Sequence, residues 1–347
     1  MSLLLSGLLI SSLIFGAALS IMFFKRKWDP RGLHCFVTGG SAGLGLSLAV
    51  ALTKKGADVS IVARNEDRLR AALDQLEAVR QTPNQILKSY SFSVDDASNA
   101  AAALEAACEP HGGRCPDAMF LCAGKSRPGF FVEQDEESLR RGMDESYWAQ
   151  AWSALAAAKR LVRHHAKGKI VFVSSFLGYM SLVGYSTYSP GKFAIRGLAE
   201  SLQSELMLYD VDVHICFPGT IRTPGFEEEN KIKPKVTLKL EESDPGADPD
   251  VVAEGLLRGV QKGYFHITYD ILGNIFRAST CGSSPRNNAL DLLWGFIGFI
   301  ALPIWRYTVD SAVREHRKEH EAYLADLGFF TSETPEGAKP VALKTAS

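Results

Sequence analysis

The feature that most constrains the fold of this chain is a glycine-rich turn that joins a short apolar run to an apolar helical pattern. The run 34–38 is typical of a strand, and the helical pattern continues from Leu46. Glycine lets the backbone approach a pyrophosphate closely, and the free N–H groups and dipole of a helix N-terminus would receive it. Strand, turn and helix in this order favour a nucleotide site over a simple turn, formed by Gly39, Gly40, Ser41, Ala42, Gly43, Leu44 and Gly45.

The central part of the chain, from about residue 31 to residue 280, alternates short strand-like runs with longer helical patterns. This alternation is typical of βαβ units around a parallel sheet. We therefore predict an α/β protein with a Rossmann-type, doubly wound parallel sheet in a single domain, and a hydrophobic share of 46% supports its core. The predicted strands are 34–38, 58–63, 87–93, 118–121, 169–174 and 211–217, with a weaker one near Phe265.

An uncharged apolar run at the N-terminus, residues 3–24, has about the 20 residues that a helix needs to cross a membrane. The basic cluster 25–27 follows this run, whereas a cleaved signal peptide would carry its positive charge before it. The flanks therefore favour an N-terminal transmembrane helix over a signal peptide. Because positive flanks stay in the cytosol, everything downstream is expected on the cytosolic side.

A second apolar stretch, residues 289–305, is shorter and contains Asp291 and Pro303. Basic residues flank it on both sides, so the charge rule gives it no orientation. It is compatible with a membrane span, with an interfacial helix, or with a helix that covers a substrate cleft. We divide the chain into an anchor, a catalytic domain, a hydrophobic membrane-associated segment and a polar tail, at residues 1–27, 31–280, 281–308 and 309–347.

Charge and cysteine content exclude some classes of function. A formal net charge of −1 gives no electrostatic reason to expect a nucleic-acid partner. The six cysteines are scattered, without the spacing of a metal site, so we predict no metal. Free thiols in a reducing compartment are the simplest interpretation.

The spacing T-G-x-x-x-G-x-G in the glycine-rich turn resembles that of the short-chain dehydrogenase/reductase family. At the end of the second predicted strand, where NAD enzymes place an acidic residue, this chain has Arg64. A guanidinium there pairs with a 2′-phosphate, so Arg64, with Ser41 and Arg68, favours NADPH over NADH. The resemblance also implies that Asp95 faces the adenine.

A possible catalytic set follows in the order that the family uses. Tyr188 and Lys192 match the family's Y-x-x-x-K and, being four residues apart on a helix, share one face. The lysine ammonium would lie beside the phenol and the cofactor ribose, and its charge is expected to lower the pKa of the phenol. The phenol would then donate a proton to a ketone oxygen, and Ser175, at the end of a strand, would hydrogen-bond the carbonyl.

Further positions follow the family's pattern in part. Ile221 and Thr223, after Pro218-Gly219, resemble its contacts to the nicotinamide carboxamide. The family's N-A-G element is here Cys122-Ala123-Gly124, and the helix asparagine that often completes a tetrad is replaced by Ser146. That replacement puts the proton relay to bulk water in doubt.

The substrate is indicated only by resemblance. The runs 169–175, 192–200 and 223–230 resemble those of 3-ketodihydrosphingosine reductases. Such enzymes reduce 3-ketosphinganine to sphinganine with NADPH at the endoplasmic reticulum membrane, facing the cytosol. The resemblance therefore implies a long-chain keto-amine lipid substrate and a membrane partner. In the run Glu227, Glu228 and Glu229, the charge either attracts the substrate ammonium or marks a solvated helix start.

Two other functions remain open on the sequence. A membrane-anchored reductase of a steroid or retinoid carbonyl would share the anchor, Arg64 and the catalytic set. A catalytically silent NADPH-binding membrane scaffold is motivated by Ser146. The segments 148–158 and 192–207 lie where the family commonly dimerises, so a homo-oligomer is also expected.

Overall fold

The computed structural model of this protein describes residues 28–330. Its centre is a seven-stranded sheet of order β3-β2-β1-β4-β5-β6-β7, in which every neighbouring pair is parallel. The strand order reverses between β1 and β4, and in such sheets ligands bind at this point, outside the carboxyl ends of the strands. The strands are β1 His34–Thr38, β2 Asp58–Ala63, β3 Leu87–Ser91, β4 Ala118–Leu121, β5 Gly168–Val173, β6 Val211–Cys216 and β7 His266–Ile267.

The predicted α/β fold with a doubly wound parallel sheet is confirmed. The bounds of β1, β2 and β4 are as predicted, while β3, β5 and β6 end one or two residues earlier than the sequence pattern indicated. Ser174 and Ser175 follow β5 at the carboxyl edge of the sheet, where the Ser174 N–H still donates to the Cys216 carbonyl oxygen of β6 at 2.8 Å.

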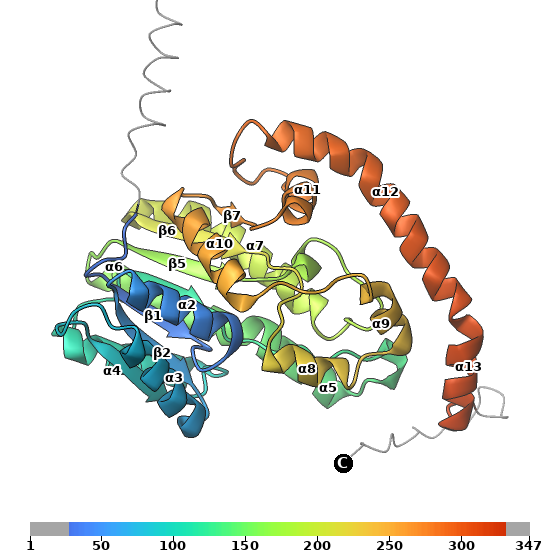
Figure 1. The fold of residues 1–347 in the computed structure, drawn as a ribbon, viewed down its shortest axis with the longest axis horizontal. Coiled ribbons are helices and arrows are strands. Elements are labelled where there is room, and N and C mark those ends of the chain that lie inside the picture. Colours follow the sequence, from blue (N-terminus) through green and yellow to red (C-terminus); the bar gives the residue numbers. More distant parts are fainter. Residues whose placement is uncertain (1–27, 331–347) are drawn as a thin grey trace, which may run out of the picture.

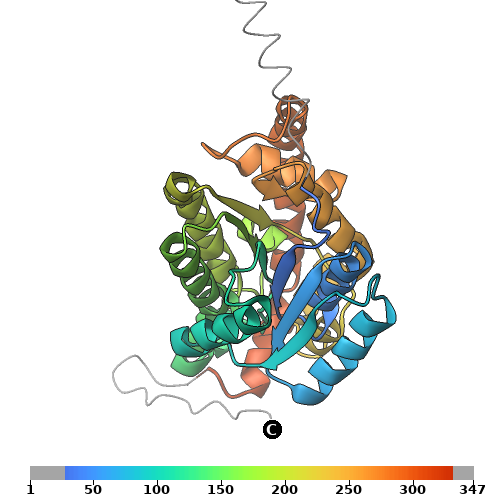
Figure 2. The same ribbon diagram turned by 90° about the vertical axis from the view of Figure 1, so that its left-hand side faces the viewer.

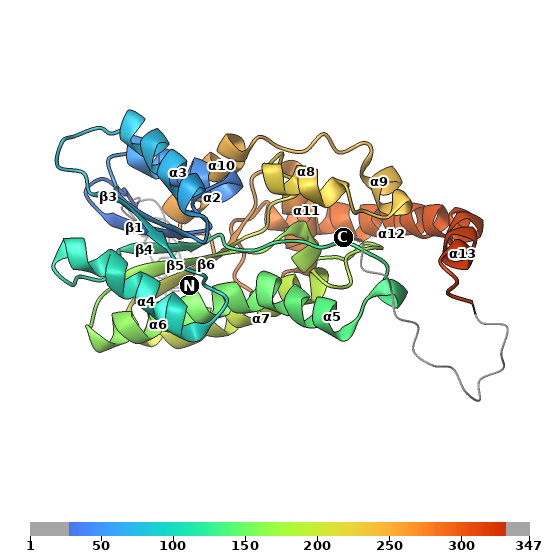
Figure 3. The same ribbon diagram turned by 90° about the horizontal axis from the view of Figure 1, so that it is seen from below.

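Helices cover both faces of the sheet (Figures 1 and 3). Helices α2, α3 and α10 pack on one face, and α4, α6 and α7 pack on the other. Each face buries its own cluster of aliphatic and aromatic side chains, as expected of a parallel sheet that is covered on both sides. The helices are α2 Gly43–Lys54, α3 Glu66–Ala78, α4 Ala97–Cys108, α6 Ala149–Arg163, α7 Ser189–Glu205 and α10 Pro249–Gln261.

Shorter helices and one long helix gather beyond the carboxyl edge of the sheet (Figure 1). Figure 2, seen from the left-hand side of Figure 1, shows the sheet between its two layers of helices. The long helix, α12, packs against α11 and α9 and continues into the short helix α13. All members of this group except α13 contribute residues to the wall of the space into which the strands point. The group comprises α5 Glu136–Met143, α8 Pro224–Asn230, α9 Lys235–Glu241, α11 Ile271–Thr280, α12 Asp291–Glu315 and α13 Arg317–Asp326.

The second apolar stretch of the sequence is the first part of α12. This helix runs through Pro303 and across residue 308, so the predicted start of the polar tail falls inside a helix. Asp291, the acidic residue of this apolar stretch, has a structural role. It is fully buried and forms a bidentate ion pair with Arg277, with both N–O distances 2.7 Å. The pair joins the start of α12 to α11.

By length and composition, α12 is able to cross a membrane, although its first part packs on the domain. The predicted N-terminal transmembrane helix, residues 3–24, lies outside the described residues, as does the end of the polar tail after residue 330.

Candidate active site

A single large cavity, about 1490 Å³ in volume, opens at the carboxyl edge of the sheet. It brings together residues that lie far apart in the sequence, from β1 to α12. The predicted site residues on its wall are Gly39, Ser41, Ala42, Gly43, Leu44, Gly45, Arg64, Arg68, Asp95, Ser175, Tyr188, Lys192, Ile221 and Thr223. Gly40 is not on the wall; a Cβ at this position would lie 2.7 Å from the side chain of Ile61, so its glycine serves packing against β2.

The glycine spacing in the turn has a steric cause. Gly39 has φ +67°, and a Cβ there would lie 3.0 Å from the backbone of Ala123 in the loop after β4. A Cβ on Gly45 would lie 2.3 Å from the carbonyl oxygen of Gly39, so the first turn of α2 packs directly onto the turn before it. Gly43 is also at positive φ, and a Cβ on this residue would lie 3.0 Å from Cγ2 of Thr223. The turn and the loop after β6 therefore meet across the cavity.

The N-terminus of α2 fits a phosphate group. Its first N–H groups have no intrahelical partner, its N-cap Ala42 offers no side-chain acceptor, and its first turn holds no acidic residue. Six other helices, α3, α4, α5, α8, α10 and α11, are capped by Asn65, Asp96, Asp135, Thr223, Asp248 and Asp270. Unlike these, α2 turns unsatisfied donors toward the cavity, where an anion would satisfy them.

Two arginines stand beside this helix end. Arg64 and Arg68 are exposed, line the cavity and, within the described residues, form no side-chain ion pair. Arg70, which lies on α3 as Arg68 does, pairs instead with Asp67. The side chains of Arg64 and Arg68 thus remain available to an anionic group in the cavity. Asp95, exposed after β3, lines the same end.

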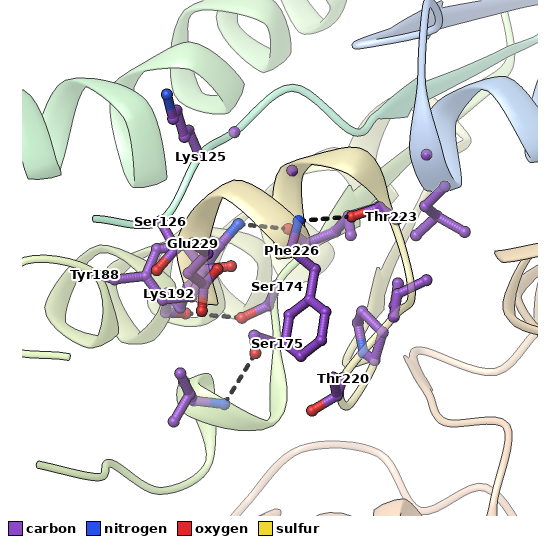
Figure 4. A pocket seen from close by; sticks show the side chains of 18 of the residues that line it. Lys125, Ser126, Ser174, Ser175, Tyr188, Lys192, Thr220, Thr223, Phe226 and Glu229 are labelled. Carbon is purple, nitrogen blue, oxygen red and sulfur yellow. Dashed lines mark hydrogen bonds between the residues drawn. The ribbon is translucent and has the colours of Figure 1, made fainter. Parts of the chain in front are cut away.

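The catalytic residues predicted from the sequence lie together on the wall of the cavity (Figure 4). Ser175 follows β5, and its Oγ accepts a hydrogen bond from the backbone N–H of Leu177 at 3.2 Å. Its neighbour Ser174 is buried and donates to the carbonyl oxygen of Lys192 at 3.0 Å. Of the two serines, Ser174 therefore holds α7, and Ser175 lines the cavity beside Tyr188, where its hydroxyl can reach a ligand. Tyr188 stands at the N-terminus of α7.

The pKa of the Tyr188 phenol is raised, and the prediction that it is lowered was wrong. Burial raises the pKa of Tyr188 above its ordinary value, the negative charge of Glu229 raises it further, and a hydrogen bond with Ser175 opposes this rise. We predicted a pKa lowered by Lys192. However, the Lys192 ammonium lies 5.3 Å from the centroid of the Tyr188 ring and donates to the carbonyl oxygen of Val173 at 3.0 Å. Burial lowers the pKa of Lys192 itself to about 8.

Ser146, at the position of the family's helix asparagine, packs between Gly142 and Gly191. Ser146 is fully buried in a π-helical turn, Asp144–Trp148, and donates to the carbonyl oxygen of Gly142 at 2.5 Å. A Cβ on Gly191 would lie 1.8 Å from Ser146 Oγ, so Ser146 packs directly against the backbone of α7 at a position that only glycine fits. π-Helical turns of this kind are frequent at functional sites.

Gln150 is a positioning residue that the sequence did not reveal. It is buried, its Nε2 donates to the carbonyl oxygen of Val173 at 2.8 Å, and its Oε1 accepts from the Val173 N–H at 3.1 Å. The Val173 carbonyl therefore receives both Gln150 and Lys192. The only sequence signal was its spacing of four residues from Ser146, which places both on one helix face.

The three glutamates of the acidic run 227–229 have different surroundings in the structure. Glu227 and Glu228 are exposed, and Glu228 pairs with Lys231 at 2.5 Å. Glu229 instead lines the cavity, together with Glu241 of α9, a residue that the sequence did not single out. Only one member of the run can therefore act on a ligand in the cavity.

One end of the cavity is apolar. Trp305 of α12 packs edge-on against Phe276 of α11, with ring centroids 5.6 Å apart. Of the three interpretations of residues 289–305, the structure supports a helix that covers the cleft. The apolar wall consists of Phe176, Leu177, Met180, Leu182, Leu272, Ile275, Phe276, Ala301, Leu302 and Trp305.

Comparisons with known proteins agree with this geometry. Residues 34–233 match the family described as short chain dehydrogenase. A protein of Cryptococcus neoformans named 3-ketodihydrosphingosine reductase is 42% identical over 332 residues, covering 94% of this chain and 99% of that protein. A Danio rerio protein named 3-dehydrosphinganine reductase is 32% identical over 286 residues, covering 82% and 85%. The solved structure of a short-chain type dehydrogenase/reductase from Mycobacterium ulcerans, 26% identical, has a TM-score of 0.61 and covers 69% of this chain and 89% of its own.

Proposed function

This chain belongs to the short-chain dehydrogenase family, and from that membership we propose that it reduces 3-ketosphinganine to sphinganine with NADPH. The observation that carries the proposal is the shape of the cavity, which joins a phosphate-binding helix end, the catalytic set Ser175, Tyr188 and Lys192, and a long apolar wall. Relatives named for this reaction match the chain over most of its length. A lipid ketone has the polar head and the apolar chain that such a cavity accommodates.

The nicotinamide cofactor, when bound, supplies a hydride to the carbonyl carbon. Tyr188, protonated because its pKa is raised, donates its phenolic proton to the carbonyl oxygen, which completes the alcohol. Ser175 orients the same oxygen through its hydroxyl. Lys192, fixed by the Val173 carbonyl, holds its ammonium near the phenol and the ribose side of the cavity.

The preference for NADPH is assigned to Arg64. Hydrogen bonds to a charged partner contribute about 1.5–3 kcal/mol, so Arg64→Ser should raise the Kd for NADPH about tenfold to hundredfold. The Kd for NADH, which lacks the 2′-phosphate, should change little, and cofactor fluorescence titration measures both. Arg70→Ser, in the helix α3 that follows Arg64 and paired with Asp67, is the matched control. Equal losses for both cofactors in Arg64→Ser would contradict the assignment.

The main rival substrate class is a steroid or retinoid carbonyl. Detergent-solubilised full-length protein should oxidise NADPH with 3-ketosphinganine and not with a steroid ketone or a retinal offered side by side. Turnover of the steroid or the retinal alone would retain the mechanism and reject the lipid assignment.

For localisation, we propose the endoplasmic reticulum membrane with the catalytic domain facing the cytosol. The family resemblance and the basic cluster 25–27 support this proposal, as does the outward face of α12. That face exposes large apolar side chains over several turns, namely Leu292, Leu293, Phe296, Phe299, Ile300 and Ile304. Exposed apolar patches of this kind mark membrane or protein contacts.

If α12 contacts the membrane, substitutions on its exposed apolar face should impair the reduction of a substrate held in vesicles but not of a water-soluble substrate. Phe296→Ser combined with Phe299→Ser should raise the KM for vesicle-borne ketosphinganine about tenfold or more, because burial of each ring contributes about 1.5–3 kcal/mol. The KM for a short-chain, water-soluble analogue should stay unchanged. Leu208→Ser, at an equally exposed leucine outside α12, is the control. A defect with both substrates would show that the two rings serve folding instead.

A further inference from the structure

The wall of the cavity beside Tyr188 carries a cluster of charged side chains that the reaction described above does not use. The Tyr185 hydroxyl lies 2.8 Å from Glu229 Oε1 of α8 and 2.7 Å from Glu241 Oε1 of α9. Two helices thus bring one carboxylate each to the same phenol. Tyr185, Glu229 and Glu241 all line the cavity.

The cluster holds an excess of negative charge. Lys233 is the cation shared by both carboxylates, with its Nζ 3.3 Å from Glu229 and 2.6 Å from Glu241, and its side chain has 0% exposure. Two carboxylates and one ammonium leave one negative charge without a counter-charge in this cluster. The two glutamate side chains are 17% and 18% exposed, and a mostly buried charge without a partner is costly.

The excess charge acts on the reaction centre. The Tyr185 and Tyr188 rings lie with centroids 6.3 Å apart, and the charge of Glu229 raises the pKa of Tyr188. On its own, such a charge weakens the proton donor. A cation bound at Glu229 would reverse this effect, because an opposite charge nearby favours loss of the phenolic proton.

An unpaired hydroxyl lies on the same stretch of wall. The Oγ of Ser126 is buried and, within residues 28–330, has no hydrogen-bond partner. Ser126 lines the cavity, and Figure 4 shows it with Tyr188 and Glu229 around the pocket. This part of the wall therefore offers both an anionic group and a free polar group to a ligand.

We infer that Glu229 and Glu241 bind the ammonium group of an amino-ketone substrate, so that these two carboxylates select substrates with an amine next to the reacting carbonyl. The inference rests on the proposed function, because in 3-ketosphinganine the amine and the ketone occupy adjacent carbons. When the ketone oxygen is at Tyr188, the ammonium must lie within a few ångströms of it, which is where the cluster has its excess charge. The substrate thus neutralises the cluster and strengthens its own proton donor.

The test compares two ketones on the full-length protein in detergent: 3-ketosphinganine and 1-hydroxyoctadecan-3-one, which lacks only the amine. Glu229→Gln and Glu241→Gln should each lower kcat/KM for the amino-ketone about tenfold or more and should not lower kcat/KM for the amine-free ketone, because loss of negative charge near Tyr188 only favours proton donation to that ketone. Glu227→Gln and Glu228→Gln, exposed on the same helix, should change neither value.

The wild-type protein gives a result that does not depend on the folding of any variant. It should prefer the amino-ketone over the amine-free ketone by about tenfold or more in kcat/KM. Equal efficiency with the two ketones, or equal losses for both ketones in Glu229→Gln, would overturn the ammonium site and leave the proposed reductase intact. Turnover of neither ketone by the wild type would reject the proposed function, and the inference with it.

Discussion

Replacing Tyr188 with phenylalanine is expected to lower kcat for ketone reduction by about 10²–10⁴-fold, the usual contribution of a positioned general acid. The ring keeps its buried position, but the hydroxyl that donates the proton is lost. The Kd for NADPH should stay within about twofold, because this substitution leaves the helix end and Arg64 unchanged. Stopped-flow absorbance of NADPH measures the rate, and fluorescence titration measures the Kd.

Tyr269→Phe is the matched control, because Tyr269 lines the same cavity outside the catalytic set. It should retain wild-type kcat within a small factor. If Tyr188→Phe kept the full rate, the phenol would not be the proton donor. If the wild type bound NADPH but turned over no ketone, the interpretation as a silent scaffold would take first place.

Replacing Lys192 with methionine is expected to abolish activity and at the same time stabilise the fold. Burial lowers the pKa of Lys192 from an ordinary value of 10.5 to about 8, so the folded state carries a charge that burial makes costly. Below pH 8 the Lys192 side chain is protonated in both the unfolded and the folded state, and its burial lowers the free energy of unfolding by the full amount. Between pH 8 and 10.5 the unfolded state binds more protons, so wild-type stability rises with pH and the cost disappears.

At pH 7, Lys192→Met should therefore raise the free energy of unfolding by about 1–3 kcal/mol, and the gain should shrink toward pH 10.5. Thermal unfolding at several pH values measures the difference. The control Lys159→Met removes an exposed lysine of α6 and should leave stability nearly unchanged. A loss of stability in Lys192→Met would mean that the hydrogen bond to Val173 outweighs the cost of burial.

The sequence predicts the fold and the nucleotide end of the cavity because both depend on local patterns. The glycine spacing reflects contacts inside one turn, such as that between Gly39 and Gly45, and the strand pattern reflects burial on both faces of the sheet. Pro303, noted within the second apolar stretch, lies inside α12, where α11 and α9 pack against this helix. The predicted anchor, the domain boundaries and the homo-oligomer stay predictions.

The rest of the site depends on contacts that no sequence period records. The pKa of Tyr188 was predicted to fall, because sequence spacing shows Lys192 but shows neither the burial of the phenol nor the approach of Glu229. Glu241 lies 56 residues from Tyr185, at the end of helix α9, so no sequence spacing links the two. Such groups meet only when the chain folds around the cavity.

The central claim is that hydride from NADPH reaches the ketone carbon of 3-ketosphinganine in this cavity. Its most direct test is incubation of the full-length protein with 3-ketosphinganine and NADPH carrying deuterium at both positions of nicotinamide carbon 4, followed by mass spectrometry of the lipid. We predict sphinganine with one deuterium on carbon 3, and at least about a hundredfold less of this product from Tyr188→Phe over the same time. NADPH oxidation without labelled sphinganine would contradict the account.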